Sequence, residues 1–472
     1  MGKTMNAAYL GVLLVLCTTA CVPAFPKGAA RSPNTQVPLS YGGITDSTNS
    51  AQTTWRDFYH DPKLGELIDA AIRNNQELNI LTAELDIAEN EIMARRGEYY
   101  PKVGLRAGLG IDKVGTYSSQ GVSDDANGVA QNLPSFGLGL AASWEIDIWK
   151  KLRNQTKSAT IRYLATREGR HLAITNLVAE IASSYYELQA LYATLDVVKQ
   201  NIAIQQNALT VVRLQKEAAR VTELAVKRFE AEVLKNQSRQ YAIAQQMVET
   251  ENRINFLLGR FPQPIDLQRD HFADQLPPIL HAGIPSQLLE NRPDVKQAWL
   301  EILAANLDVK VAKASFYPAL GINATLGLQS FDPLKLVSFP ASLVYGLAAD
   351  LMVPLINRKA ITANYFSANS RELQAVYHYE RAILSGFVEV SKLLSMVYNL
   401  EQSYNLKTQE VEKLTQSIDI SGRLFSSARA DYMEVLLTRR DALEAQLELI
   451  ENKKRQLLAA VSLYRALGGG WR

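Results

Sequence analysis

The residues that could do chemistry are few, and their spacing does not favour catalysis. Glu145 and Asp147 are two positions apart, so two carboxylates could project from one face of a strand as a general acid and base would. Their neighbours include Gly and Ser residues, which favour a water-facing strand instead. No nucleophile elbow or phosphate loop occurs. The histidines are scattered without the spacing of metal ligands, at positions 60, 171, 271, 281 and 378. We therefore expect no catalytic residues, no metal site and no enzyme activity.

The composition narrows the class of protein. The 472 residues include 50 Lys and Arg against 48 Asp and Glu, a net charge of +2 that is too balanced for a protein that neutralises nucleic-acid phosphates. Both cysteines lie in the first 21 residues, which excludes a disulfide scaffold and a cysteine metal site in the body. No uninterrupted apolar run of about 18 residues follows the N-terminus, which excludes helical membrane spans.

The N-terminus has the features of an export signal. Lys3 precedes a short apolar core at residues 7–16, which predicts a signal peptide over residues 1–20. Residues 18–21, Thr-Thr-Ala-Cys, resemble the bacterial lipobox, in which the cysteine is acylated, although Thr18 replaces the usual Leu. Cleavage nearby without acylation is the alternative. We expect a covalent lipid on Cys21 as the only added group, and a lipidated leader over residues 21–60 that is rich in Pro, Ser, Thr and Gly up to residue 54.

The chain repeats itself once. Residues 99–110 and 316–327 share Pro, Gly, Ala, Leu and Gly in register, about 217 positions apart. Leu257-Leu258-Gly259 corresponds to residues 466–468, and residues 74–78 correspond to residues 291–295. We therefore expect two structural repeats, over residues 61–260 and 285–472, joined by an equatorial linker over 261–284.

Each repeat contains two runs that alternate between apolar residues and small or polar ones, which is the period of a β-strand. We expect β-hairpins at 101–148 and 318–355, with their loops near 113–133 and 330–341. Each run has about ten residues, the length that a tilted strand needs to cross a bilayer. A soluble, half-buried sheet would alternate as well, but the export signal and the polar opposite face favour membrane strands. Four strands cannot close a barrel, and open edges in lipid leave backbone groups unpaired, so several chains must share one barrel.

Very long helices account for the remainder. No proline lies between Pro134 and Pro262 or after Pro354, and apolar residues recur every three or four positions. A helix over 151–215 would be on the order of 100 Å long. Thr222 and Asp431 are expected N-caps at the turns of the two long helical hairpins. The predicted helices lie near 61–98, 151–215, 223–258, 285–316, 357–422 and 430–466.

The ordered set of motifs resembles the TolC-type outer membrane factors, and most closely the OprM/NodT lipoprotein branch. The resemblance is carried by the paired Tyr-Pro blocks, Trp-Glu-Ile-Asp-Ile-Trp at 144–149, Tyr-Met-Glu-Val-Leu at 432–436 and Ala-Leu-Gly-Gly-Gly-Trp at 466–471. It implies a mainly α fold with a membrane β portion: a trimeric, twelve-stranded β-barrel with four strands from each chain, continued by an α-helical barrel.

The resemblance also implies a function and partners. Such a homotrimer would be the passive exit duct of a tripartite efflux system in the outer membrane of a Gram-negative bacterium, lipid-anchored and with a periplasmic helical extension. It would dock on a periplasmic adaptor protein coupled to an inner-membrane pump, and would contact outer membrane lipid but no nucleic acid. A type I-like protein secretion duct and a lipid-tethered structural periplasmic coiled coil are the alternatives.

Site residues follow from the same resemblance. Glu434 matches the acid of the periplasmic aperture, whereas Leu437 stands where the family has a second acid. Further aperture candidates are Asp431, Asp419 and Arg423, and the expected adaptor-contacting tip residues are Arg220, Thr222, Glu223 and Arg429.

The sequence departs from the family pattern at several glycine positions. Ala219 and Ala428 stand where family members usually have Gly before the tip turns, and Lys150 and Asn357 replace common glycines after the β-hairpins. Because Ala tolerates a positive φ less well than Gly does, the sequence does not determine the backbone geometry of the two tips.

Overall fold

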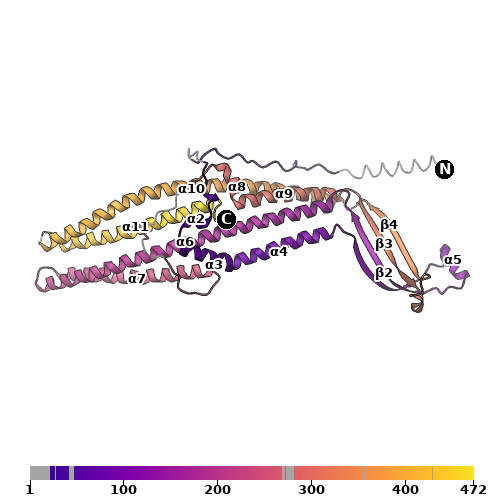
Figure 1. Ribbon diagram of the computed structural model, residues 1–472, viewed down its shortest axis with the longest axis horizontal. Helices are drawn as coiled ribbons and strands as arrows, with labels where there is room; N and C mark the ends of the chain where they lie inside the picture. The colour runs from indigo at the N-terminus through magenta and orange to yellow at the C-terminus, as the bar shows by residue number, and fades with distance from the viewer. Residues whose placement is uncertain are drawn as a thin grey trace. The chain divides into compact units, whose positions relative to one another are not determined.

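The computed structural model describes residues 22–26, 28–41, 47–267, 272, 281–354, 356, 358–427 and 429–472 (Figure 1). The predicted signal peptide, Cys21, much of the predicted linker, Asn357 and Ala428 lie outside these residues. The described chain is mainly helical and contains a four-stranded sheet, which confirms the predicted combination of long helices with a smaller β portion.

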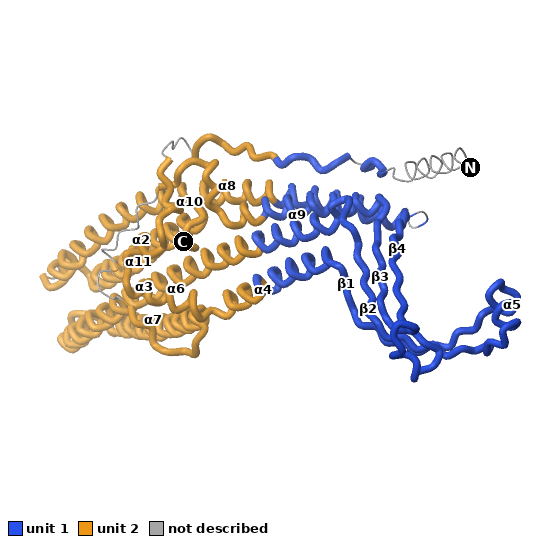
Figure 2. The backbone as a smooth tube through the Cα atoms, turned by 45° about the vertical axis from the view of Figure 1, so that its right-hand side comes forward, with its two compact units in different colours: residues 1–33, 85–165, 298–378 blue, residues 34–84, 166–297, 379–472 orange. Residues whose placement is uncertain are grey.

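The chain forms two compact units (Figure 2). The first unit contains residues 1–33, 85–165 and 298–378, and the second contains residues 34–84, 166–297 and 379–472. Each sequence repeat therefore contributes to both units, and the units do not follow the repeat boundaries.

The sheet belongs to the first unit. Its strands are β1 (Lys102–Asp112), β2 (Leu133–Ile146), β3 (Ala319–Ser330) and β4 (Leu343–Met352). They pair antiparallel in the order β1-β2-β3-β4, so β1 and β4 are the two edges. The loop after β1 contains helix α5 (Ser119–Ala126), which the sequence analysis did not predict; the hydroxyl of Ser118 accepts from the Gly121 amide and caps it. The loop after β3 contains the short helix η3 (Pro333–Lys335).

Long helices enter and leave the strands. Helices α4 (Gln76–Gly97) and α9 (Pro293–Ala314) precede β1 and β3, whereas α6 (Lys151–Glu217) and α10 (Arg358–Ser426) follow β2 and β4. Helix α7 (Glu223–Leu257) follows α6, and α11 (Tyr432–Ala466) follows α10, to form the two helical hairpins. The remaining helices of the second unit are η1 (Ser50–Gln52), α2 (Trp55–Tyr59), α3 (Pro62–Asn74), η2 (Pro285–Gln287) and α8 (Leu288–Asn291).

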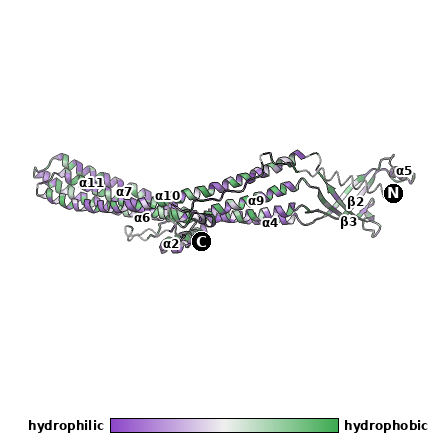
Figure 3. Cartoon of the chain, turned by 90° about the horizontal axis from the view of Figure 1, so that it is seen from above, coloured by the Kyte–Doolittle hydropathy of each residue, from purple (hydrophilic) through white to green (hydrophobic). Residues whose placement is uncertain are grey.

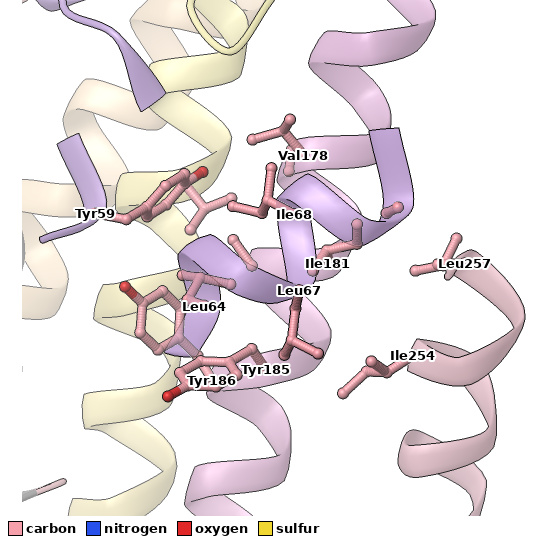
Figure 4. Close-up of a cluster of buried hydrophobic side chains, with 14 of the residues drawn as sticks. Tyr59, Leu64, Leu67, Ile68, Val178, Ile181, Tyr185, Tyr186, Ile254 and Leu257 are labelled. Carbon is pink, nitrogen blue, oxygen red and sulfur yellow. The ribbon is translucent and has the colours of Figure 1, made fainter. Parts of the chain in front are cut away.

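The largest buried cluster of the second unit packs α3 against α6 and α7 (Figure 4). Leu64 and Ile68 of α3, Ile181 and Tyr185 of α6, and Ile254 of α7 are all essentially inaccessible to solvent. Their burial is the main source of stability that holds the short helix α3 on the long helices.

Two predicted helices are each interrupted once, so their prediction as continuous helices was wrong. Asn75, between α3 and α4, is extended, and its side chain accepts from the Leu78 amide to begin the new helix. Arg292, between α8 and α9, is also extended. It precedes Pro293, and a residue before proline disfavours the helical conformation.

These two breaks make equivalent contacts in the two repeats. The side chain of Asn75 donates to the carbonyl of Leu257 over 2.9 Å, and the side chain of Arg292 donates to the carbonyl of Ala466 over 2.6 Å. The donors are 217 positions apart and the acceptors 209, the two offsets seen in the sequence repeat. The sequence repeat is therefore also a repeat of tertiary hydrogen bonds.

The Leu-Gly motifs that end α7 and α11 are equivalent too. Gly259 and Gly468 have φ values of 65° and 96°, the left-handed conformation that closes a helix C-terminus. A β-carbon on Gly259 would lie 2.4 Å from the carbonyl oxygen of Asn74, and one on Gly468 would lie 2.6 Å from that of Asn291. Both positions therefore need glycine for conformation and for space.

One helix among the described residues, α10, contains a stretch that is long and apolar enough to cross a membrane by length and composition alone. Such a stretch was not predicted, because polar residues interrupt the apolar ones along α10. Apolar and polar residues are mixed along α10 (Figure 3), and 17% of the stretch is buried inside this chain.

Candidate functional site

The sheet has one apolar and one polar face. Residues paired across neighbouring strands point to the same face, so the register assigns every strand residue to a side. Leu105 pairs with Leu140, which pairs with Leu326, which pairs with Tyr345. Every second residue before and after these four lies on the same face, and most of these residues are apolar as well. Its large residues are Val103, Leu105, Leu109 and Ile111 of β1, Phe136, Leu138, Leu140, Trp144 and Ile146 of β2, Leu320, Ile322, Leu326 and Leu328 of β3, and Leu343, Tyr345, Leu347 and Leu351 of β4.

The large residues of the edge strands on this face are uncovered in the single chain. Leu105 of β1 is 75% exposed and Leu347 of β4 is 79% exposed. A contiguous apolar surface of this size is unusual on a soluble protein and marks a surface that contacts lipid or another protein. The alternation predicted from the sequence is therefore present in all four strands.

The opposite face carries small and charged residues. Arg106 pairs with Gly139, and Gly139 pairs with Gly327, so an arginine extends beside two glycines. A hollow of about 540 Å³ lies over the helix-proximal end of this face. Its polar lining includes Lys102, Ser143, Glu145, Lys151, Asn323 and Asp350. A face of this kind suits contact with water, as the sequence analysis predicted.

Asp147 does not share this water-facing position with Glu145, so their prediction as a pair on a water-facing strand was wrong. β2 ends at Ile146, and the Asp147 side chain caps the N-terminus of α6, the helix that follows. Its carboxylate accepts from the backbone amides of Leu152 and Arg153 at 3.1 and 3.0 Å and from the Arg153 guanidinium at 3.0 Å. Glu145 instead pairs with Lys151 at 2.8 Å.

The cap changes the acidity of Asp147. Burial alone would raise the pKa of this carboxyl, whose side chain is 2% exposed, but the hydrogen bonds from Arg153 and Leu152 outweigh burial and hold the pKa below its usual value. Lys150, which replaces a common family glycine, adopts a left-handed φ of 61° at this junction. The strand-to-helix turn thus keeps its geometry without glycine.

Aromatic residues gather where the strands meet the helices. The Trp144 indole donates to the carbonyl of Tyr99 over 3.0 Å, and the Trp149 indole donates to the carbonyl of Pro318 over 2.7 Å. Trp149 also stacks on Tyr317 at 4.7 Å between ring centroids. Trp and Tyr concentrate at the polar boundary of membranes because their rings are apolar and their edges hydrogen-bond.

The first helical tip, between α6 and α7, closes with a Schellman motif. The Arg220 amide donates to the carbonyl of Gln215, and the Ala219 amide donates to that of Lys216, both over 2.9 Å. Ala219 has a φ of 53°, the conformation that glycine adopts more easily. Thr222 occupies the N-cap position of α7, as predicted, but the expected capping hydrogen bond from its side chain is not formed.

Charged side chains are paired within the first tip. Lys216 contacts the carboxylate of Glu223 across the turn, and Lys227 contacts both Glu223 and Glu230. The hydrogen bond and the charge of Lys216 hold the pKa of Glu223 below its usual value. The predicted tip residues Arg220, Thr222 and Glu223 are all exposed.

The second tip, between α10 and α11, shares one backbone hydrogen bond with the first tip but differs from it in electrostatics. The Arg429 amide donates to the carbonyl of Leu424 over 2.9 Å, which is equivalent to the Arg220 bond 209 positions earlier. Asp431 caps α11 by accepting from the Tyr432 amide at 2.7 Å, as predicted. The Arg423 guanidinium donates to the backbone carbonyl of Asp419 over 3.3 Å.

The candidate aperture acids remain available for other contacts. Glu434 lies in the first turn of α11, and it is exposed, as are Asp419 and Asp431. Within the described part of the chain, none of these three carboxylates forms an ion pair. The four aperture candidates lie at the end of α10 and the start of α11. The first tip differs, because its Lys and Glu side chains form ion pairs with one another.

Arg439 is a charged residue that the sequence analysis did not single out. It follows Val435 by one helical turn on α11 and is half-buried, and its Nε has no hydrogen-bond partner within the described chain. Burial lowers the pKa of its guanidinium. In the sequence, Arg439 could have been recognised as a charged residue in a helical series of otherwise apolar positions.

The described residues contain no group of three or more His, Cys, Asp or Glu side chains placed to hold a metal. His171 instead stacks on Trp471 at 4.4 Å between ring centroids and contacts Glu168. The histidine therefore has a packing partner in the C-terminal motif.

Comparison with known proteins identifies the fold and the family. The family model "Outer membrane efflux protein" matches residues 67–260 and 284–469. The chain is 26% identical over 462 residues to the cation efflux system protein CusC of Escherichia coli O6:H1, covering 98% of this chain and 97% of CusC. It is 26% identical over 467 residues to the pyoverdine export outer membrane protein OpmQ of Pseudomonas aeruginosa, covering 99% and 97%.

A solved structure gives the same fold. The MtrE outer membrane channel of Neisseria gonorrhoeae, in its open state, superposes with a TM-score of 0.84 at 22% identity, covering 96% of this chain and 98% of MtrE. The chain therefore has the fold of this channel.

The family match includes most of both sequence repeats. It confirms the predicted role as an outer membrane exit duct of an efflux system, with helices that extend into the periplasm. The chain belongs to the outer membrane efflux protein family.

Proposed function

We propose that three copies of this chain close one barrel and form a passive duct. The observation that supports this most strongly is the two-faced sheet with open edges at β1 and β4. In lipid, each unpaired backbone group of an edge strand costs several kcal/mol, so the edges must pair with other copies. Three copies of four strands would give twelve, the barrel that the family resemblance implies.

The apolar stretch of α10 supports assembly by the helices as well. Only 17% of it is buried inside the single chain. Leu384 and Val388 of α10 are more than half exposed. Copies packed side by side would bury these residues, and their removal from water would favour the trimer.

We propose that Glu434 lines the periplasmic aperture, together with Asp419, Arg423 and Asp431. In a trimer, each carboxylate would be repeated three times around the axis, and a ring of carboxylates attracts cations. Their lack of ion pairs within the described chain leaves their charge uncompensated, which supports this role. Arg220, Thr222, Glu223 and Arg429 would form the surface for a periplasmic adaptor protein, which in turn would join the duct to an inner-membrane pump.

We propose further that the duct is lipid-anchored through Cys21 and carries out no catalytic step. Membership of the family does not identify the cargo. The names of the two relatives give different cargo, cations for CusC and pyoverdine for OpmQ, although both are 26% identical to this chain. A duct whose polar face carries small and charged residues without a built binding site would pass cargo that the inner-membrane pump selects.

The test is the copy number and conductance of the purified full-length chain. Native mass spectrometry in detergent should give three copies, and the unheated sample should migrate differently from the boiled sample in a gel. Planar bilayers should show discrete conductance steps. A monomeric, non-conducting rod would favour the structural coiled coil. A conducting trimer encoded beside a protein-exporting ATPase would favour the type I-like secretion duct.

A further inference from the structure

The two β-hairpins are equivalent residue by residue. Their first strands, β1 and β3, are related by the 217-position offset of the sequence repeat. Their second strands are related by 209 positions, because Phe-Gly-Leu at 136–138 of β2 corresponds to Tyr-Gly-Leu at 345–347 of β4. The register agrees with both offsets, since Gly321 pairs with Asp350 and their equivalents in the first hairpin also pair. Each hairpin is therefore one copy of the same unit of sheet.

The register inside the chain predicts the register between chains. β2 of the first hairpin pairs with β3 of the second, and in this pair Ser143 lies opposite Asn323. In the closed barrel proposed above, on which this inference rests, β4 pairs in the same way with β1 of the neighbouring copy. The two offsets convert Ser143 to Met352 and Asn323 to Arg106. Met352 of one copy is therefore expected opposite Arg106 of the next, and both residues belong to the polar face, as paired residues must.

This register brings an acid of β4 to the arginine of β1. Asp350 is two positions before Met352 on the same face of the strand. Diagonal neighbours of this kind across an antiparallel pair are roughly 7–8 Å apart, a distance that a long side chain spans. We infer that Arg106 of one copy forms an ion pair with Asp350 of the next, so that each of the three seams between copies carries one such pair.

Within one chain, neither charge is compensated. Arg106 and Asp350 are exposed, and neither forms an ion pair with another described residue. The other charged residues of β1, Lys102 and Asp112, are four and six positions from Arg106, about 14 and 20 Å along the strand. Both separations exceed the Debye length of about 10 Å at 0.1 M salt, so these interactions are largely screened. A partner for Arg106 has to come from across the seam.

The Asp350 carboxylate is oriented for a second donor. Nδ2 of Asn323 donates to Oδ2 of Asp350 over 2.7 Å, which leaves Oδ1 without a hydrogen bond to the described residues. Asn323 pairs with Ala348, so this bond is itself a diagonal contact of the kind inferred at the seam. Because Asn323 is the equivalent of Arg106, Asp350 lies between two equivalent positions. One holds an amide of its own chain and the other a guanidinium of the next.

The ion pair helps to select one register at the seam. β1 contains three glycines on its polar face, and glycine-rich strands specify their register weakly. A slip of one residue would turn the apolar face to the other side of the sheet, whereas a slip of two residues keeps both faces in place. A two-residue slip that moves Asp350 away from Arg106 puts four positions between them and breaks the pair.

Disulfide cross-linking tests the register. The same offsets, applied to the pair of Ala142 with Ala324, place Leu351 of one copy opposite Ala107 of the next. Chains that carry both Ala107→Cys and Leu351→Cys should form covalent trimers on oxidation in a membrane. Ala107→Cys with Leu347→Cys is the matched control, because its second cysteine is on the same face but about 14 Å further along β4. Cross-linking of the control in place of the first pair would overturn the register.

A double-mutant cycle tests the ion pair itself. Arg106→Gln and Asp350→Asn should each shorten the lifetime of the unheated trimer in detergent at least threefold, and the combination should lose little more than either alone. Exchange of the charges, by Arg106→Asp with Asp350→Arg, should lengthen the lifetime above that of either exchanged residue alone. Glu145→Gln supplies the control, since Glu145 pairs with Lys151 of its own chain and should act additively with Arg106→Gln. Additive losses from Arg106→Gln and Asp350→Asn would show that the two residues do not interact.

The duct and the ion pair can fail separately. A monomer in native mass spectrometry of the unsubstituted protein would contradict the proposed duct and, with it, the contact between copies. A conducting trimer that cross-links in another register, or that shows no coupling in the cycle, would leave the duct in place and overturn the ion pair.

Discussion

Gly139 of β2 and Gly327 of β3 are paired in register so closely that neither has room for a side chain. A β-carbon on Gly139 would lie 2.5 Å from the α-carbon of Gly327, and one on Gly327 would lie 2.7 Å from that of Gly139. The pair joins the two sequence repeats at the centre of the sheet. It keeps the polar face free of side chains there, beside Arg106.

Gly139→Ala is therefore expected to disturb the pairing of β2 with β3 and to reduce assembly of the heat-modifiable oligomer severalfold. Contacts below 3.0 Å to backbone atoms cannot be relieved by a side-chain rotation, so the strands themselves must move. Gel migration of unheated samples measures the effect. Gly137→Ala is the matched control, because it lies on the same face with no atom within 4 Å of the added carbon. Equal assembly of both variants would contradict the close approach.

Asp147→Asn should destabilise the junction between β2 and α6 by about 2 kcal/mol at pH 7. The substitution removes a charge that accepts from two backbone amides and a guanidinium while the side chain is almost fully buried. The apparent Tm in detergent reports the loss. Glu145→Gln is the control, since Glu145 is partly exposed and its pair with Lys151 should contribute less than 1 kcal/mol.

The same cap predicts a pH dependence. The pKa of Asp147 is lower in the folded protein than in the unfolded chain, so its stabilisation is complete above the unfolded pKa of about 3.9 and is lost as the pH falls through the folded pKa. The difference in Tm between the unsubstituted protein and Asp147→Asn should therefore be full at pH 7 and narrow below about pH 4. A difference that widens in acid would reverse the assigned sign.

Ala219→Gly should stabilise the first helical tip by about 0.5–1 kcal/mol. Ala219 has a positive φ, which costs an L-residue more than glycine, although glycine loses more backbone entropy on folding. Native-state hydrogen exchange of the Arg220 amide, which bonds to Gln215, measures the local opening. Ala218→Gly, one position earlier and without the positive φ, should have no stabilising effect.

Glu434→Ala should raise the single-channel conductance in planar bilayers and weaken the preference for cations, if the three copies of this carboxylate line the constriction. The exposed Glu444, also on α11 but further from the tip, supplies the control variant Glu444→Ala. Unchanged conductance and unchanged cation preference in Glu434→Ala would count against a gating role.

Much of this fold follows from periodicity, which is local information. The alternation around Leu105 and Leu347 predicted the strands and their two faces, and the register of the sheet agrees with it. The long helices follow from the absence of proline and from apolar spacing. The breaks at Asn75 and Arg292 depend on tertiary hydrogen bonds to Leu257 and Ala466, although Pro293 was a visible signal for the second break.

Side-chain partners were harder to predict than elements. Glu145 and Asp147 are two positions apart, the spacing of residues on one face of a strand. Because β2 ends between them, Asp147 caps a helix, whereas Glu145 faces the hollow. Thr222 and Asp431 hold the same N-cap position, yet only Asp431 uses its side chain. The position of Glu434 was predictable by resemblance, whereas the lack of an ion-pair partner for it among the described residues depends on the tertiary structure.

The contact between the N-terminal leader and α10 has a consequence for the order of folding. The Ala30 amide donates to Oδ1 of Asn369 over 3.0 Å, although the two residues are 339 positions apart in the chain. Export proceeds from the N-terminus, so the leader emerges long before the part of α10 that it contacts. This contact therefore forms only after all four strands have been exported.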